Sequence, residues 1–97
     1  MIRSFRNQGT EDVFNNVGSK AARRVCPPDV LEVARRKLQM IDLATTLTDL
    51  KSPPNNKLEK LEKNRAGRHA IRINGQYRVC FVWNDGAAEE VELVDYH

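Results

Sequence analysis

Hydrophobic and polar residues follow a helical period over one long segment of the chain. Apolar residues recur at steps of three and four between positions 28 and 45, which predicts an amphipathic helix there. Pro28 favours a helix start, because proline lacks the N–H group that the first turn leaves unpaired. A shorter helix is predicted between Thr10, which can cap its start, and Gly18, a residue typical of helix ends.

Alternation of apolar and polar residues predicts strands elsewhere in the chain. One is a short, half-buried strand at residues 2–5. Three more are predicted toward the other end of the chain, at 69–73, 76–83 and 91–94. Asn74-Gly75 indicates a hairpin between the first two of these, and Asn84-Asp85-Gly86 turns the chain again. The order β-α-α-β-β-β describes an α+β fold, in which a two-helix hairpin packs on a small antiparallel sheet.

Length and composition restrict the kind of protein. The 97 residues fit one domain, residues 1–97, because domains usually contain roughly 100–200 residues. A chain this short buries only about 60–65% of its unfolded surface, which argues against a deep enclosed substrate cavity. No apolar run approaches the roughly 18–20 residues of a membrane span, and no signal peptide is recognisable. We therefore expect a cytoplasmic protein without membrane contact.

The two cysteines, Cys26 and Cys80, do not form a C-x-x-C pair. Both lie among apolar residues, which is typical of reduced cysteines in the core of a cytosolic protein. This pattern excludes a secreted disulfide-rich scaffold, and it also excludes a zinc site built from four cysteine and histidine ligands.

The net charge of +3 conceals an uneven distribution. Eight of the 16 basic residues lie between Lys51 and Arg78, together with only two acids. Five of the 13 acidic residues lie between Asp85 and Asp95, where there is no basic residue. The basic segment suggests an anionic partner, with nucleic acid as the first candidate. The alternative is a solvated basic face that the neighbouring acidic segment neutralises.

Six motifs, in this order along the chain, carry a resemblance to a known family. They are Ile2-Arg3-Ser4-Phe5, Leu58-Glu59-Lys60-Leu61, Asn64-Arg65-Ala66-Gly67, Ile71-Arg72-Ile73-Asn74, Gln76-Tyr77-Arg78-Val79-Cys80-Phe81 and Val91-Glu92-Leu93-Val94-Asp95-Tyr96-His97. The chain resembles the HigB branch of the RelE/ParE toxin superfamily, the plasmid-maintenance killer proteins. The resemblance covers essentially the whole chain, and the element order predicted above is that of the RelE-like fold.

This resemblance implies the toxin of a type II toxin–antitoxin system. Such a toxin is a ribosome-dependent endonuclease that cuts the mRNA codon in the ribosomal A site and inhibits translation and growth. The family uses no metal and no cofactor, and its products resemble those of 2′-hydroxyl attack on the adjacent phosphate. The implied partners are a HigA-like helix-turn-helix antitoxin, the ribosome with its mRNA, and operator DNA only through the antitoxin complex.

Cleavage by this route needs a base for the 2′-hydroxyl proton, an acid for the leaving oxygen and cations for the transition-state charge. His97 is the first catalytic candidate, because histidine titrates near neutral pH and the resemblance puts a catalytic histidine at this end. The alternative is a frayed terminal residue. Asp95 can orient His97 or share in proton transfer, or instead form a salt bridge with Arg78. Tyr96 can stack on a base or donate to a phosphate, or instead cover the core.

Two arginines complete the predicted catalytic set. Arg65 matches the family pattern before Gly67 and can bind a phosphate with its guanidinium fork, although a loop arginine more often serves solubility. Arg78 either reaches the phosphate or anchors the acidic last strand. Further RNA- or ribosome-binding candidates are Lys57, Lys60, Lys63, Arg68, His69 and Arg72. Some relatives have an additional histidine or lysine in the loop at 58–63, and here Glu59 and Glu62 weaken the positive field, which is compatible with a slow or weak nuclease.

Two other functions fit the same architecture. One is a binding toxin without nuclease activity, such as a gyrase-directed toxin. The other is a co-repressor that contacts operator DNA only with its antitoxin. The motif Asp95-Tyr96-His97 favours the enzyme, because a toxin that only binds has no need of an acid–base group there.

Overall fold

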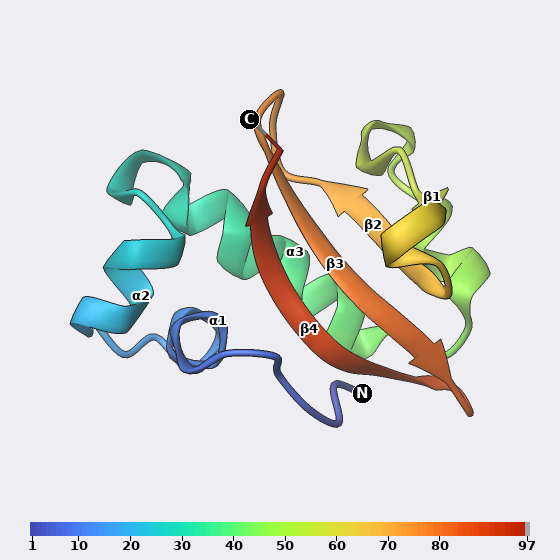
Figure 1. Cartoon of the computed structure of the whole chain (residues 1–97), viewed down its shortest axis with the longest axis horizontal. Helices are drawn as coiled ribbons and strands as arrows, with labels where there is room; N and C mark the ends of the chain where they lie inside the picture. Colours follow the sequence, from blue (N-terminus) through green and yellow to red (C-terminus); the bar gives the residue numbers. More distant parts are fainter. Residues whose placement is uncertain (97) are drawn as a thin grey trace.

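The computed structural model describes residues 1–96. One antiparallel sheet, with strands in the order β1-β2-β3-β4, forms the centre of the molecule (Figure 1). The strands are β1 (Glu59–Lys60), β2 (Arg68–Arg72), β3 (Tyr77–Asn84) and β4 (Ala87–Asp95). The α-helices are α1 (Gln8–Phe14), α2 (Lys20–Val25) and α3 (Leu31–Leu43). The α+β class and the antiparallel sheet predicted from the sequence are confirmed.

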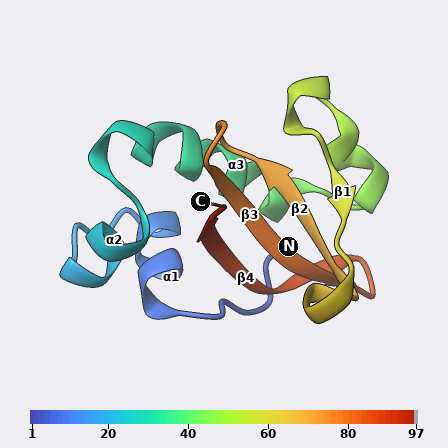
Figure 2. The same ribbon diagram turned by 45° about the horizontal axis from the view of Figure 1, so that its top comes forward.

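Helix α3 covers one face of the sheet and forms the core with it. A short 3-10 turn, Pro28–Val30, leads into this helix, as the two prolines predicted. Ala34, Leu38 and Ile41 lie on one stripe of α3 and are fully buried. They belong to a single hydrophobic cluster with side chains from the sheet, including Phe81. Figures 1 and 2 show α3 crossing behind the sheet, with α1 and α2 beside one another at one end.

The first helix begins earlier than predicted and is followed by a second one. Asn7, not Thr10, caps α1, since the Asn7 side chain accepts a hydrogen bond of 2.8 Å from the Thr10 N–H. Ser19 caps α2, which the sequence did not predict because its six residues carry no repeated apolar stripe. The two helices approach closely at Gly9, where an added Cβ would lie 2.5 Å from the Ala21 carbonyl oxygen.

Residues 2–5 were predicted to be a strand, and this is wrong. They form only two isolated parallel bridges to β4, Ile2 to Ala88 and Phe5 to Val91. Between these bridges β4 is bulged, and Glu90 has a left-handed backbone with φ of 50°. The bulge interrupts the ladder that a continuous strand would need. The element order therefore differs from β-α-α-β-β-β at its beginning.

Both predicted turns of the sheet are present, whereas strand β1 was not predicted and β4 begins at Ala87 and not at the predicted residue 91. Asp85 and Gly86 both have positive φ, 54° and 74°, as a tight two-residue turn between β3 and β4 requires. The Asn74 side chain accepts hydrogen bonds from the N–H groups of Gln76 and Tyr77 and so shapes the β2–β3 hairpin. None of the helices formed by residues 1–96 has the length and hydrophobicity needed to cross a lipid bilayer.

Candidate active site

The face of the sheet opposite α3 is open and carries polar side chains of β3 and β4. Val79 and Phe81 point into the core, so the alternate residues Arg78 and Cys80 point to the open face. Glu92 lies directly across from Cys80 in the β3–β4 ladder and shares this face. No α-helix formed by residues 1–96 lies over this face of the sheet (Figure 1).

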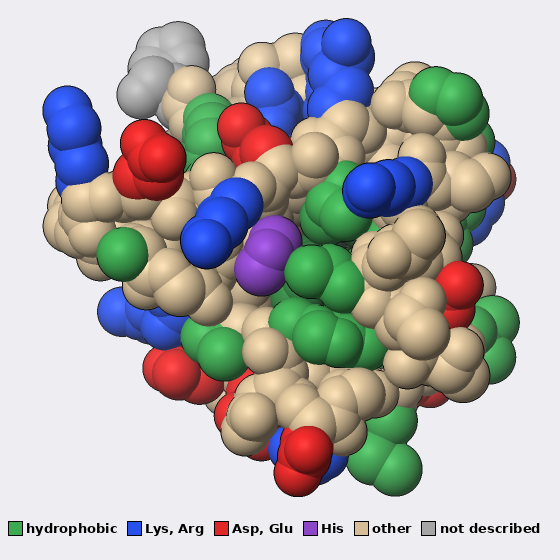
Figure 3. Space-filling view, turned by 90° about the vertical axis from the view of Figure 1, so that its right-hand side faces the viewer, with side chains coloured by type: hydrophobic (Ala, Val, Ile, Leu, Met, Phe, Trp, Pro, Cys, Tyr) green, Lys and Arg blue, Asp and Glu red, His purple; other side chains and the backbone are tan. Residues whose placement is uncertain are grey.

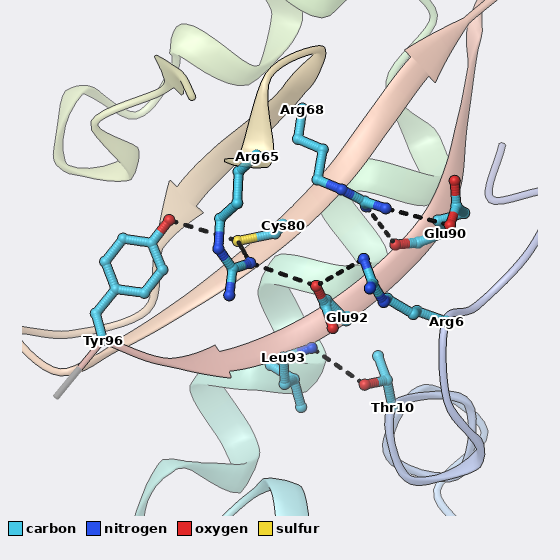
Figure 4. A network of polar contacts seen from close by, with 9 residues as sticks. All are labelled: Arg6, Thr10, Arg65, Arg68, Cys80, Glu90, Glu92, Leu93 and Tyr96. Atoms are coloured by element: carbon cyan, nitrogen blue, oxygen red, sulfur yellow. Dashed lines mark hydrogen bonds and ion pairs between the residues drawn. The ribbon is translucent and has the colours of Figure 1, made fainter. Parts of the chain in front are cut away.

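Glu92 lies between two arginines from distant parts of the chain. Arg65 Nη1 is 3.4 Å and Arg6 Nη1 is 3.7 Å from the same carboxylate oxygen, Oε1. Figure 4 shows the two guanidinium groups approaching the carboxylate from opposite sides. The Glu92 side chain is only 14% exposed, whereas the two arginines are half-exposed. Each guanidinium has five N–H donors, so most remain free for an anionic ligand.

Arg68 forms a second ion pair on this face. Its Nη2 is 3.2 Å from Glu90 Oε1, and its Nη1 donates to the Glu90 carbonyl oxygen at 3.4 Å. A polar cavity of about 210 Å³ lies among the charged groups and is lined by Arg6, Asn64, Arg65, Arg68 and Glu92. The three arginines and one carboxylate make this cavity cationic, which suits a phosphate group.

Tyr96 lies over the open face and contacts two of its residues. Its hydroxyl is 3.6 Å from the buried Cys80 Sγ, and its ring has the Arg78 Cζ 5.3 Å from its centroid. This second distance is within the range of a cation–π contact. Burial and the hydrogen bond to Cys80 raise the pKa of the Tyr96 hydroxyl to about 12. Tyr96 therefore stays protonated at neutral pH and can donate a hydrogen bond, but it cannot act as a base.

The end of β4 is fixed to the β2–β3 hairpin. The Tyr96 N–H donates to the Gln76 carbonyl oxygen at 2.7 Å, and the Gln76 side chain donates to both Asp95 carboxylate oxygens at 3.1 Å. Asp95 pairs with Tyr77 in the ladder and therefore lies on the helix-covered side, away from Tyr96. His97, the first catalytic candidate, is outside the described residues.

The salt bridge considered between Asp95 and Arg78 is not present among residues 1–96. Arg78 Nη1 instead donates to the carbonyl oxygens of Asn74 and Tyr77, the second at 3.0 Å. These contacts hold the guanidinium at the hairpin and under the Tyr96 ring. Of the two alternatives for Arg78, the one in which it anchors an acid of the last strand therefore does not hold within residues 1–96.

His69, one of the predicted RNA- or ribosome-binding candidates, does not join the open-face cluster. Its ring stacks on Phe81 at 6.2 Å between centroids, and its Nδ1 is buried without a hydrogen-bond partner. Burial and the nearby Lys60 lower the pKa of His69. Lys60 lies across from His69 in the β1–β2 pair. On the side of the molecule where β1 and β2 lie, a histidine is surrounded by hydrophobic and basic side chains (Figure 3).

The other basic candidates are distributed over two places. Lys63 is exposed at the start of a 3-10 turn, Lys63–Arg65, that brings Arg65 to the open face. Lys57 and Arg72 instead line a different cavity beside α3. The structure thus brings Arg65, Arg68, Arg78 and Tyr96 together.

Sequence reasoning did not identify Arg6 and Glu92 as site residues. Arg6 carries no local signal, because its position depends on the bridge that pairs the neighbouring Phe5 with β4. Glu92 has a signal: it lies between Val91 and Leu93, both buried, so a two-residue period places it on the opposite face. Residues 1–96 contain no group of three or more His, Cys, Asp and Glu side chains arranged to hold a metal ion.

Solved structures share this arrangement at low sequence identity. The YoeB–YefM complex from Staphylococcus aureus matches with a TM-score of 0.60 and 16% identity over 100% of this chain and 98% of that chain. YafQ from E. coli strain BL21(DE3) matches with a TM-score of 0.56 and 13% identity over 98% and 93% of the two chains. The fold is that of the RelE-like toxins.

Sequence comparison is more specific. A family model described as the RelE-like toxin of the type II toxin–antitoxin system HigB matches residues 3–97. Toxin HigB-1 from Vibrio cholerae serotype O1 is 43% identical over 88 residues, which cover 91% of this chain and 90% of that protein. Endoribonuclease HigB from Proteus vulgaris is 29% identical over 97 residues, the full length of both. The chain belongs to the HigB-like toxin family, as the sequence motifs predicted.

Proposed function

We propose that this chain is a ribosome-dependent endoribonuclease, a toxin that cuts mRNA codons in the ribosomal A site and so stops translation and growth. The observation that carries the proposal is the protonated Tyr96 hydroxyl beside the guanidinium groups of Arg65 and Arg78 on an open sheet face. The full-length similarity to Endoribonuclease HigB of Proteus vulgaris supports the same reaction.

In the proposed reaction the ribose 2′-oxygen attacks the adjacent phosphorus and the bond to the 5′-oxygen breaks. The products are a 2′,3′-cyclic phosphate and a 5′-hydroxyl. Arg65 and Arg78 stabilise the additional negative charge on the phosphate, and Tyr96 donates a hydrogen bond to it or a proton to the leaving oxygen. His97 takes the 2′-hydroxyl proton, and Asp95 assists it. This route moves protons between side chains and RNA and uses no cofactor or metal.

The open geometry supports dependence on the ribosome. The cavity at Glu92 has a volume of only about 210 Å³ and the Arg6 and Arg65 side chains around it are half-exposed, so the chain alone cannot enclose a codon. A codon presented in the A site arrives already unpaired and surrounded by ribosomal RNA. Lys60, Lys63 and Arg68 contact that RNA in this proposal, and cleavage takes place in the cytoplasm. In this proposal His69, whose ring packs on Phe81, also contacts RNA from strand β2.

An antitoxin completes the proposed system. Members of the family are described as toxins of the type II toxin–antitoxin system HigB. Solved structures with this fold include a complex named YoeB–YefM. We expect a HigA-like helix-turn-helix antitoxin that inhibits this chain and carries it to operator DNA.

Adding the purified protein to a translating extract tests the proposal. The wild type should cut mRNA within codons, while the same RNA without ribosomes stays largely intact. Arg65→Ala should abolish cutting, and Arg23→Ala, an exposed arginine on α2, should not change it. Equal cutting by the wild type and Arg65→Ala would contradict the proposal.

A further inference from the structure

A second, larger cavity lies beside the free end of β2. It has a volume of about 430 Å³ and lies among α3, the turn Pro54–Asn56 and the last residues of β2. Its basic lining residues are Arg36, Lys37, Lys57 and Arg72. None of its lining residues, all within the described chain, is acidic. This composition contrasts with the open-face cavity, where Glu92 lies among the arginines.

Within residues 1–96, no ion pair joins the four cations of this cavity to a carboxylate. The ion pairs formed within residues 1–96 use Arg3, Arg6, Arg65 and Arg68. Arg36 and Lys57 are exposed, so their charged groups are free to meet an anion. Burial, and to a smaller extent the positive charge of the neighbouring Arg36, lowers the pKa of Lys37. An anion in the cavity would offset this repulsion between like charges.

A buried polar network fixes Lys37 and the loop that leads to Lys57. Lys37 is only 7% exposed, and its Nζ donates to the Asn56 side-chain oxygen. Asn56 is fully buried and donates in turn to the carbonyl oxygens of Leu50 and Ser52 at 3.1 and 3.2 Å. The next residue, Lys57, has a left-handed backbone with φ of 48°. The loop is thus fixed by its own hydrogen bonds, so little ordering is needed when a ligand binds.

Arg72 connects this cavity to the open face. It lies directly across from Arg78 in the β2–β3 ladder, and neighbouring strands are about 5 Å apart. Both guanidinium groups reach the same hairpin: an added Cβ on Gly75 would lie 3.7 Å from Arg72 Nη2, and Arg78 donates to the Asn74 carbonyl. Strand β1 pairs only with His69 and Ala70, so this end of β2 is a free edge. Basic side chains therefore form a path from Arg78, under the Tyr96 ring, through Arg72 at the edge of the sheet to the cavity beside α3.

We propose that this cavity binds a nucleotide that flanks the cleaved one, with its phosphate on Arg36, Lys57 and Arg72. Guanidinium groups match phosphate oxygens bidentately. The side chains of Val33 and Ile73 supply an apolar wall for the ribose or base. A compact cavity within the usual size range for small ligands suits one nucleotide better than an extended acidic peptide. The identity of the ligand as RNA rests on the proposed function.

Binding of uncleavable 2′-O-methyl oligoribonucleotides, followed by amide NMR shifts, tests this subsite. A dinucleotide should perturb only the open face, whereas a longer oligonucleotide should also perturb Arg36, Lys57 and Arg72. The double variant Arg36→Glu, Lys57→Glu should lose about tenfold or more in affinity for the longer oligonucleotide only, with a shallower salt dependence, because about 0.7 counterion is released per phosphate contact on single strands. The double variant Arg36→Gln, Lys57→Gln, which removes the two charges without reversing them, should lose less affinity for the longer oligonucleotide.

The matched control is Lys20→Glu, Arg24→Glu, which makes the same charge change at exposed positions of α2. The proposed subsite would be overturned if the control variant lost as much affinity for the longer oligonucleotide. It would also be overturned if the cavity variant lost as much affinity for the dinucleotide, or if the longer oligonucleotide did not bind the wild type. Weakened antitoxin binding with unchanged RNA binding would assign the cavity to an acidic peptide instead. Because the NMR measurement does not depend on cleavage, an inactive wild type in the translating extract would refute the proposed function alone.

Discussion

The Tyr96 hydroxyl lies 3.6 Å from the Sγ of Cys80, a residue fully buried under the open face. Burial raises the pKa of the Cys80 thiol as well, so both groups are neutral at neutral pH. The pair gives the proposed site a neutral hydrogen-bond donor held over a neutral, buried thiol. Arg65 Nη1 at 4.0 Å from the same sulfur completes the contact between donor and cation.

Tyr96→Phe should slow mRNA cleavage without unfolding the domain. The substitution removes only the hydroxyl that donates to the phosphate or to the leaving oxygen. Loss of such a donor typically lowers kcat by about 10²–10³. Cleavage rates in a translating extract at saturating protein would measure this. Tyr77→Phe is the control, because Tyr77 lies in the same sheet on the helix-covered side, and its variant should cut at the wild-type rate.

The same tyrosine makes stability depend on pH in the alkaline range. The pKa of Tyr96 is raised from 10.0 to about 12 on folding, so its contribution is fully present below about 10 and is lost as pH rises through about 12. The free energy of unfolding, measured with urea across this range, should fall less steeply in Tyr96→Phe than in the wild type. If the free energy of unfolding depended on pH in the same way in both proteins, the raised pKa of Tyr96 would be contradicted.

Glu92→Gln should increase the affinity of the open face for inorganic phosphate. Removing the carboxylate leaves Arg6 and Arg65 without the anion that they now share, and makes the cavity, which Arg68 also lines, more cationic. The cost in unfolding free energy should stay below about 1 kcal/mol, because ion pairs with half-exposed arginines contribute little. NMR titration with phosphate measures the affinity. Glu89→Gln, which removes the partner of Arg3, should bind phosphate as the wild type does.

Gly9→Ala and Gly18→Ala should affect stability in opposite ways. A Cβ at Gly9 would lie 2.5 Å from the Ala21 carbonyl oxygen, so α1 and α2 must move apart and the protein should be destabilised by about 1–3 kcal/mol. A Cβ at Gly18 meets nothing within 4 Å, and the smaller entropy of the unfolded chain should make this variant neutral or slightly more stable. Thermal unfolding would measure the stability of both variants. A Gly9→Ala variant as stable as the wild type would contradict the close approach of α1 and α2.

The parts of the fold predicted correctly are those in which one period persists for several residues. Helix α3 repeats its apolar stripe over three turns, and β3 has a turn signal at each end. Helix α2 is too short to show a period, and its start depends on the hydrogen bond from the Ala22 N–H to Ser19 Oγ. Residues 2–5 have a strand pattern, but the bulge at Glu90 prevents a ladder.

Residues of the candidate site were predicted where short motifs contain them, and were missed where only tertiary contacts bring them to the site. Arg65, Arg78 and Tyr96 were identified from short motifs, and the structure brings them together over Cys80. Arg6 reaches Glu92 only because the segment before α1 bridges to β4. A single sequence holds no information on a contact between such distant residues.

Neither border of the sheet offers a long, regular run of unpaired backbone. On one side β1 has only two residues, and on the other side residues 2–5 lie along β4 through two bridges. An exposed, regular border strand would recruit strands from other molecules and lead to aggregation. The bulge that breaks the ladder thus has a benefit, because it leaves a border too irregular to serve as a template.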